Sequence, residues 1–342
     1  PAAMTATAKA ARQACDEFAE LWKQRFGKLP RVKDDREVGN ADIAESNLVL
    51  YGAPADNLLT ARVVGRLPVT FDREGRIRLG SETYSGANLG IKLCYPNPLN
   101  PRCYVALVAG CTAASYADVN RRFGNWFDWI PYDYRNHFDY AVFDDLTVGR
   151  APETFLVWGF FGEDWSVEKG VRFPAVAAWR QRLRPRTLPR VEAPVPGQGQ
   201  AFLDEAAAEA IQLDKEYVER NRNLDGQDLH LEGESHKRGL AFRFPGAITF
   251  RNPGYQRLRA LAGIAWDGRS QPSADAEKYE RAVFSVRGSG GRELWKSEER
   301  RYDDTPLEIA VDIRGEETVT LSVSGGRVWL NGTAIWAEAR LE

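Results

Sequence analysis

The sequence predicts an α/β domain followed by an all-β sandwich. The chain has 342 residues, more than one ordinary domain usually holds. Strand and helix patterns alternate between residues 47 and 166, which is typical of a layered α/β domain. Short runs of period two, separated by glycine, aspartate and proline, fill residues 201–342, which is typical of a sandwich. We therefore predict four segments: a helix and connection (1–40), an α/β domain (41–170), a linker (171–199) and a β-sandwich (200–342).

The composition limits the classes of function. Hydrophobic residues make up 43% and charged residues 27% of the chain, which is typical of globular domains with hydrophobic cores. The formal net charge of −2 provides no field to recruit nucleic acid. No apolar run reaches the roughly 18 residues of a membrane-spanning helix. No metal or cofactor motif is present, and the four cysteines match neither a zinc nor a redox pattern. We expect no cofactor, no nucleic-acid partner and no membrane span.

The first 40 residues begin with a predicted helix over 5–26. Cys15, Phe18, Trp22 and Phe26 recur at helical spacing, which predicts one apolar face. Gly27 is a suitable stop. We interpret the face as a docking surface for the next domain, and a helix that binds a partner is the alternative.

The α/β domain is predicted from short apolar runs that alternate with helical patterns. Asp56 or Asn57 is suited to begin a helix. This alternation favours a three-layer, Rossmann-like sheet that is at least partly parallel. The predicted strands are 47–52, 69–71, 77–79, 91–95, 104–110 and 140–143, and the predicted helices are 56–65 and 115–126.

Two proline-rich segments are predicted connections. Cys94 and Cys103 flank the turn 96–101, where a disulfide is possible but buried free thiols are favoured. The segment 171–199 interleaves proline with arginine, which favours a stiff, solvated linker over a nucleic-acid patch.

The C-terminal region contains only strand signals. They occur at 240–244, 247–250, 257–265, 281–286, 307–313 and 318–323. Turn residues separate them at the spacing of a β-sandwich.

Catalytic motifs are scarce. No Gly-x-Ser-x-Gly nucleophile turn is present. The best alternative is a hydrolase that uses Cys111 or Ser115 with His137, because residues 110–112 follow a strong strand and sites of α/β sheets lie at strand ends. An inert thiol at position 111 is the favoured interpretation.

Aromatic residues suggest a different chemistry. Tryptophan suits carbohydrate because the C–H face of a pyranose stacks on the ring, while Asp, Asn and Arg bind the hydroxyls. Tryptophans of a sandwich are commonly core residues, and we favour a core position for each of Trp266, Trp295, Trp329 and Trp336 taken singly. Two of them, Trp266 and Trp329, lie beside turn residues. The candidate carbohydrate-binding residues are therefore Arg243, Trp266, Asp267, Trp329 and Asn331.

The C-terminal region resembles the novel carbohydrate-binding module family, a galactose-binding-like jelly roll. The matching pieces are Lys237-Arg238-Gly239-Leu240, the strand from Phe250 to Asp267, Ala282–Val286 and the closing Trp336-Ala337-Glu338-Ala339-Arg340-Leu341. The histidine that follows the Gly-Leu pair in the family is absent at 241–243, and Asn331–Ile335 replaces an acidic stretch. The resemblance implies a carbohydrate ligand.

The N-terminal region resembles a segment that follows the catalytic domain in bacterial prolyl-oligopeptidase-like and esterase-like hydrolases of planctomycete type. The residues behind this are Pro30–Asp35, Asn47–Gly52, Arg66–Pro68, Tyr95–Val105 and Phe160–Trp165. In those proteins the nucleophile lies upstream, so the resemblance implies that Pro1 is a processing boundary and that a catalytic hydrolase domain is a partner.

Together these observations predict a non-catalytic polypeptide that binds carbohydrate, or docks, for a larger hydrolase outside the cytoplasm. The hydrolase that uses Cys111 or Ser115 with His137 is one alternative. A structural or assembly protein that uses the proline-rich hairpin and the N-terminal helix is the other.

Overall fold

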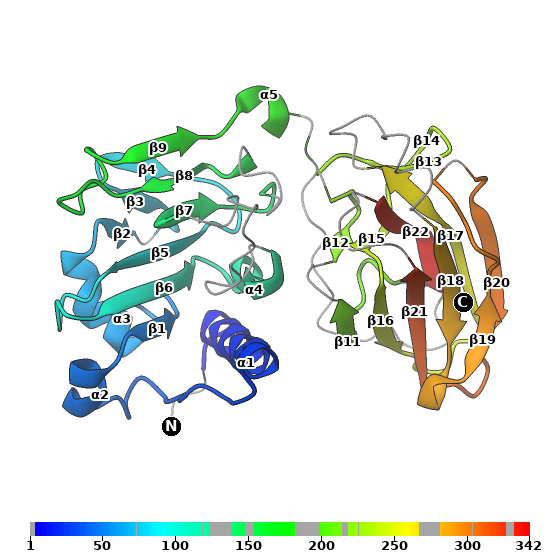
Figure 1. Ribbon diagram of the computed structural model, residues 1–342, viewed down its shortest axis with the longest axis horizontal. Helices are drawn as coiled ribbons and strands as arrows, with labels where there is room; N and C mark the ends of the chain where they lie inside the picture. The colour runs from blue at the N-terminus through cyan, green and yellow to red at the C-terminus, as the bar shows by residue number, and fades with distance from the viewer. Residues whose placement is uncertain are drawn as a thin grey trace. The chain divides into compact units, whose positions relative to one another are not determined.

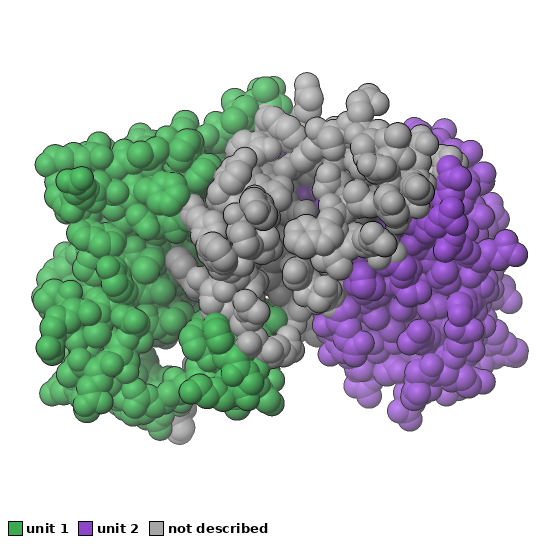
Figure 2. Space-filling view, viewed as in Figure 1, with its two compact units in different colours: residues 1–181 green, residues 182–342 purple. Residues whose placement is uncertain are grey.

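The computed structural model has two compact units, residues 1–181 and residues 182–342 (Figure 1; Figure 2). For residues 24, 25, 121, 122, 179, 213 and 266 it describes the backbone alone. The described residues are 4–72, 74–117, 119–122, 138–147, 154–181, 183, 199–213, 218–224, 226–266, 281–302, 304–325 and 332–342.

The N-terminal unit combines one long helix, a six-stranded sheet and a small three-stranded sheet. Its helices are α1 (Ala6–Phe26), α2 (Asn40–Glu45), α3 (Leu58–Val63), η1 (Val64–Arg66), η2 (Ala113–Tyr116), α4 (Val119–Arg122) and α5 (Ala177–Arg180). Its strands are β1 (Leu48–Tyr51), β2 (Val69–Phe71), β3 (Ile77–Leu79), β4 (Glu82–Tyr84), β5 (Gly90–Pro96), β6 (Tyr104–Gly110), β7 (Tyr140–Phe143), β8 (Val157–Phe160) and β9 (Val171–Pro174).

The main sheet corrects the expectation of a Rossmann-like domain. Its strand order is β1-β6-β5-β7-β8-β9, and β1 with β6 is the parallel pair, whereas β5–β6, β5–β7, β7–β8 and β8–β9 are antiparallel. The cause is visible at the proline-rich turn, where Pro96 pairs with Tyr104. A connection this short closes a hairpin, while a parallel crossover needs about a dozen residues or more. The sheet is therefore mixed and mostly antiparallel.

Both faces of this sheet are covered. On one face, α1 buries Ala11, Ala14 and Phe18 against the sheet, with Cys15 and Trp22 partly buried beside them. The predicted docking surface is confirmed for this part of the helix, whereas Phe26 is exposed. Gly27 ends the helix with a φ of 75°, a left-handed conformation that glycine adopts without steric cost. On the other face, residues of α3 and of the β2–β3–β4 sheet share a core with β5 and β6.

The C-terminal unit is all β apart from one short helical turn, η5 (Ser289–Gly291), in its described part. Its strands are β10 (Ala201–Phe202), β11 (Ala208–Leu213), β12 (Glu219–Arg220), β13 (Leu229–Leu231), β14 (Glu234–His236), β15 (Gly239–Arg243), β16 (Gly246–Arg251), β17 (Arg257–Trp266), β18 (Ala282–Arg287), β19 (Glu293–Lys296), β20 (Leu307–Asp312), β21 (Thr318–Gly325) and β22 (Gly332–Leu341).

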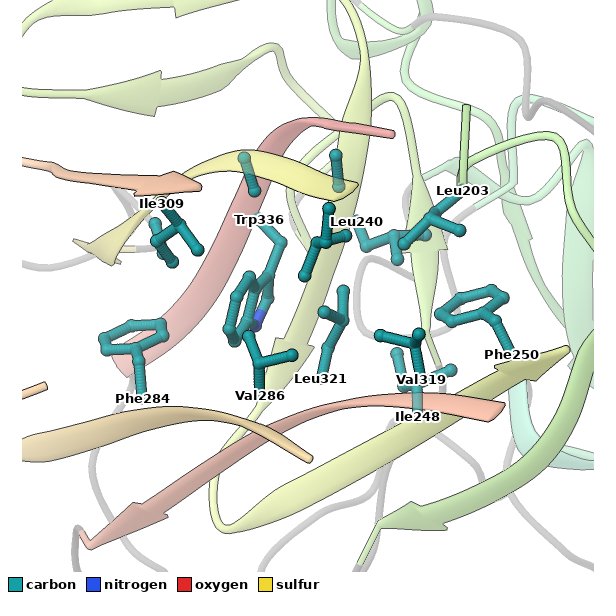
Figure 3. Close-up of a cluster of buried hydrophobic side chains, with 14 of the residues drawn as sticks. Leu203, Leu240, Ile248, Phe250, Phe284, Val286, Ile309, Val319, Leu321 and Trp336 are labelled. Carbon is teal, nitrogen blue, oxygen red and sulfur yellow. The ribbon is translucent and has the colours of Figure 1, made fainter. Parts of the chain in front are cut away.

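Two sheets form the predicted β-sandwich. One has the order β12-β15-β22-β17-β20, with β10 paired to β22, and the other has the order β11-β16-β21-β18-β19. Alternate side chains from both sheets meet between them, as the close-up of the core shows (Figure 3). Trp336 is fully buried there, with its ring centroid 5.5 Å from that of Phe284. Strands with one buried face predict this packing.

Two further expectations concern the chain as a whole. Across the described residues, no helix has both the length and the apolar character needed to cross a membrane. The four cysteines are free, half-buried thiols, in agreement with the interpretation favoured for Cys94 and Cys103.

Candidate functional site

Three strands of the sandwich converge at the end of one sheet where the candidate residues lie. β22 runs between β15 and β17 (Figure 1). Thr333 pairs with Arg243 on one side and with Ala265 on the other, and Gly332 pairs with the backbone of Trp266. Strand pairing therefore brings Arg243 and Trp266 to the same sheet end. We call this end, defined by Arg243, Trp266 and Thr333, the loop end.

The remaining candidates flank this end in the chain. Asp267 directly follows β17, and Asn331 directly precedes β22. Asp267, Trp329 and Asn331 lie outside the described residues, as does the side chain of Trp266. Their roles stay predictions.

The side chains of the loop end follow the alternation of the strands. Phe242 and Ala334 belong to the core between the sheets, whereas Ala241 and Ile335 pack on the outer face against the β13–β14 hairpin. By the period of two along a strand, Arg243 and Thr333 share this outer face. This face therefore places the half-buried side chain of Arg243 beside the fully buried side chain of Thr333.

The polarity of this end is pronounced. Arg243 is half-buried, and Thr333 is fully buried. The Thr333 hydroxyl has no hydrogen-bond partner among the described residues. A buried polar group without a partner is costly, so the loop end has unmet hydrogen-bonding capacity next to a cationic donor. Of the two side chains, only that of Arg243 is accessible, and a guanidinium can donate hydrogen bonds to the hydroxyls of a polyol.

A buried ion pair supports the loop end from the neighbouring strand. Glu219 on β12 pairs with Ala241 on β15. Ala241 precedes Arg243 by two residues in the same strand. The Arg222 Nε lies 2.7 Å from the Glu219 Oε2, and both side chains are fully buried. Breaking such a pair leaves an uncompensated buried charge, so the pair stabilises the segment from Glu219 to Arg222 at the edge of this sheet.

Two tryptophans of the sandwich, Trp295 and Trp336, pack in or against its core. Trp336 is a core residue, and Trp295 is partly buried against the same core, as we expected of both. Neither presents a ring for stacking at the loop end. Thr333 was not among the candidates, because Asn331-Gly332-Thr333 has the composition of a turn. Its position beside Arg243 follows only from the pairing of β15 with β22.

The alternative nucleophiles are poorly placed for catalysis. Burial raises the pKa of the Cys111 thiol to about 11, with Asp72 adding to the effect, whereas a reactive cysteine needs a lowered pKa. Ser115 is buried, and its hydroxyl donates a 2.7 Å hydrogen bond to the Leu89 carbonyl oxygen. His137 lies outside the described residues. Cys111 is therefore not an activated thiolate, and Ser115 is occupied by a structural bond.

Metal binding finds no support in the described part of the chain, which has no group of three or more His, Cys, Asp or Glu side chains placed to hold an ion. Two aspartates use their carboxylates in local turn hydrogen bonds instead. The Asp144 carboxylate accepts from the Leu146 backbone N–H at 3.0 Å, and the Asp304 carboxylate accepts from the Arg301 backbone N–H at 2.7 Å.

Comparison with solved structures gives several matches to part of the chain. CBM51 from Clostridium perfringens GH95, in complex with methyl-galactose, is 18% identical over 42% of this chain and 100% of that chain, with a TM-score of 0.36. The CBM51-2 and INT domains of Clostridium perfringens ZmpB are 20% identical over 42% of this chain, with a TM-score of 0.36. The match spans 31% of that ZmpB chain.

Tandem CBM51 modules of Sp3GH98, a family 98 glycoside hydrolase from Streptococcus pneumoniae, are 15% identical over 52% of this chain and 56% of that chain, with a TM-score of 0.36. No curated protein matches the chain. One family model matches part of it: residues 199–342, which contain the whole sandwich and the loop end, are similar to the NPCBM/NEW2 domain.

Proposed function

We propose that the C-terminal unit binds carbohydrate at the loop end and that the chain serves a larger hydrolase as a non-catalytic accessory part. The observation that carries the proposal is the coincidence of two findings. Residues 199–342 match a carbohydrate-binding module family, and β15, β22 and β17 bring Arg243, Thr333 and the backbone of Trp266 to one sheet end.

The chemistry of the loop end suits a neutral sugar. A guanidinium donates hydrogen bonds in a fixed planar fork, and a hydroxyl both donates and accepts. The indoles of Trp266 and Trp329 supply the apolar surface on which a pyranose face stacks, with Asp267 and Asn331 as hydroxyl ligands. We infer that the loop end binds a terminal sugar residue.

The hydrolase partner and the location outside the cytoplasm belong to the same proposal. A module that recognises sugar is of use where glycans are exposed, and it raises the effective concentration of an attached catalytic domain at its substrate. The resemblance of the N-terminal region to planctomycete hydrolases supports this assignment.

A binding assay with the full chain tests the proposal. We expect immobilised glycans, or methyl galactoside at millimolar concentration, to bind the unmodified chain. Arg243→Ala, Trp266→Ala and Trp329→Ala should each weaken binding by about tenfold or more, which corresponds to about 1.4 kcal/mol. Arg287→Ala, at an exposed arginine on β18, is the matched control and should bind normally. The absence of glycan binding by a folded chain would refute the carbohydrate assignment.

A further inference from the structure

The end of the sandwich opposite the loop end contains a hollow of about 520 Å³. Its lining includes Gly254, Tyr255, Arg257, Asp312, Arg314 and Glu342. The strand register brings these groups together, because Arg257 on β17 pairs with Asp312 on β20 and Leu258 pairs with Leu341 on β22. We call these six residues the polar pole. β17 extends from Arg257 to Trp266, which separates the two ends by about 30 Å.

The walls of the polar pole are held by one buried side chain, Asn252. Its Nδ2 donates hydrogen bonds to the carbonyl oxygens of Tyr255 at 3.0 Å and Glu316 at 3.0 Å. Its Oδ1 accepts from the backbone N–H groups of Gly254 at 3.2 Å and Tyr255 at 2.8 Å. The turn before β17 is thereby tied to the turn after β20. A binding site whose supports are fixed in advance loses little entropy when a ligand binds.

Backbone pairing fixes the remaining side. The backbone N–H groups of Gln256 and Arg257 donate to the Glu342 carbonyl oxygen at 2.9 and 2.8 Å, and the Glu342 N–H donates to the Arg257 carbonyl oxygen at 2.8 Å. Gly254 has a φ of 118°, in the region that favours glycine. A residue with a side chain would be strained at this position of the lining.

The charges of the polar pole are balanced. The lining holds two guanidinium groups, Arg257 and Arg314, and two carboxylates, Asp312 and Glu342. Arg314 Nε lies 3.0 Å from both Asp312 carboxylate oxygens, and Arg259 forms an ion pair with Glu342. Arg257 is exposed and forms no ion pair with the described residues. Equal numbers of cationic donors and anionic acceptors favour a neutral, polyhydroxylated ligand over an anion.

Carboxylates that stay ionised are the acceptors such a ligand needs. Hydrogen bonds from Arg314, with the nearby charge of Arg257, lower the pKa of Asp312 to about 2. Asp312 therefore accepts hydrogen bonds at any physiological pH, while Arg257 donates. The volume of the hollow, about 520 Å³, lies within the range of roughly 300–1,000 Å³ that is typical of small-molecule sites.

We propose that the polar pole is a second saccharide site, which binds one neutral pyranose unit through Arg257, Asp312 and Glu342. The class of ligand rests on the proposed function, whereas the location rests on the hollow and its fixed walls. A module with sites at both ends can contact two sugar units of one glycan surface at once, and its avidity then exceeds the affinity of either site.

Amide resonances of the full chain report the two ends separately. We expect titration with methyl galactoside and with N-acetylglucosamine to shift two sets of signals: 254–257 and 312–314 at the polar pole, and 243, 265 and 333 at the loop end. Arg257→Ala should weaken the first response by about tenfold, or 1.4 kcal/mol, and leave the second unchanged. Arg287→Ala, an exposed arginine of the other sheet, should alter neither.

Each outcome decides between the two sites. Shifts confined to the loop end overturn the second site and leave the proposed function intact. Shifts confined to the polar pole support the second site and overturn the proposed location of the first. An Arg257→Ala chain whose polar-pole titration matches that of the unmodified chain also overturns the proposal, because the ligand would then not contact this guanidinium. A chain that responds at neither end overturns both proposals.

Discussion

At the scale of single residues, Trp336 shows how a tryptophan in this sandwich serves the core. Its side chain is fully buried, and its indole N–H has no hydrogen-bond partner among the described residues. Trp336→Ala should lower the free energy of unfolding of the C-terminal unit by about 3–5 kcal/mol, because it opens a large cavity. Trp336→Phe should cost less, since it keeps most of the ring and removes an unpaired donor. Urea denaturation measures both, and equal losses would contradict this account.

Cys111 gives a residue-scale test of the hydrolase alternative. With a pKa of about 11, only roughly one thiol in a few thousand is ionised near pH 7.5, and the thiolate is the species that reacts. We expect iodoacetamide to label Cys111 slowly at neutral pH, with a rate that rises about tenfold for each pH unit between 7 and 9. Peptide mass spectrometry follows the labelling, and Cys111→Ser is the control. A rate that is already at its plateau at pH 7 would restore the catalytic hypothesis.

At the scale of elements, the buried ion pair between Glu219 and Arg222 stabilises β12 and the residues that directly follow it. Arg222→Met should lower the free energy of unfolding by about 3–5 kcal/mol, because Glu219 keeps a buried charge without the Arg222 guanidinium. The double variant Glu219→Leu with Arg222→Met should lose less than the single variant, since it removes both charges of the pair. Thermal or urea unfolding of the three chains checks the order of stability, and a double variant less stable than Arg222→Met would contradict it.

Element positions are the part of the fold that the sequence predicts best. The predicted strands 104–110 and 140–143 coincide with β6 and β7. Asn57 caps α3, where its Oδ1 accepts from the N–H groups of Leu59 and Thr60 at 2.9 and 3.0 Å. These features depend on local patterns and side-chain chemistry. The relative direction of neighbouring strands was predicted wrongly. The period of hydrophobic residues along a strand shows neither which strand lies beside it nor whether the two run parallel or antiparallel.

The candidate site was predictable only in part, because local patterns indicate residue types near turns but not which strands pair. Arg243 and Trp266 could be selected as polar and aromatic residues near turns, but their proximity depends on β22 pairing with both β15 and β17. The polar pole gave no sequence signal. Arg257 lies on β17, Asp312 on β20 and Glu342 directly after β22, at positions more than 20 residues apart.

At the scale of the whole molecule, the two units have separate hydrophobic cores. One large cluster fills the sandwich, and two others lie on the two faces of the N-terminal sheet. A ligand that binds one folded unit stabilises that unit by an amount that depends on its concentration relative to the dissociation constant. The division into units therefore determines where the stabilising effect of a sugar should be seen.

We expect a sugar at a concentration of about 100 times its dissociation constant to stabilise the C-terminal unit by about 2.7 kcal/mol. Amide hydrogen exchange should slow in peptides from β17 and β22 and stay unchanged in peptides from β5 and β6, because these pairs of strands belong to different units. Mass spectrometry of the exchanged chain measures both, with Trp266→Ala as the comparison for the loop end. Equal protection of both units would contradict this expectation and would mean that the two units unfold together.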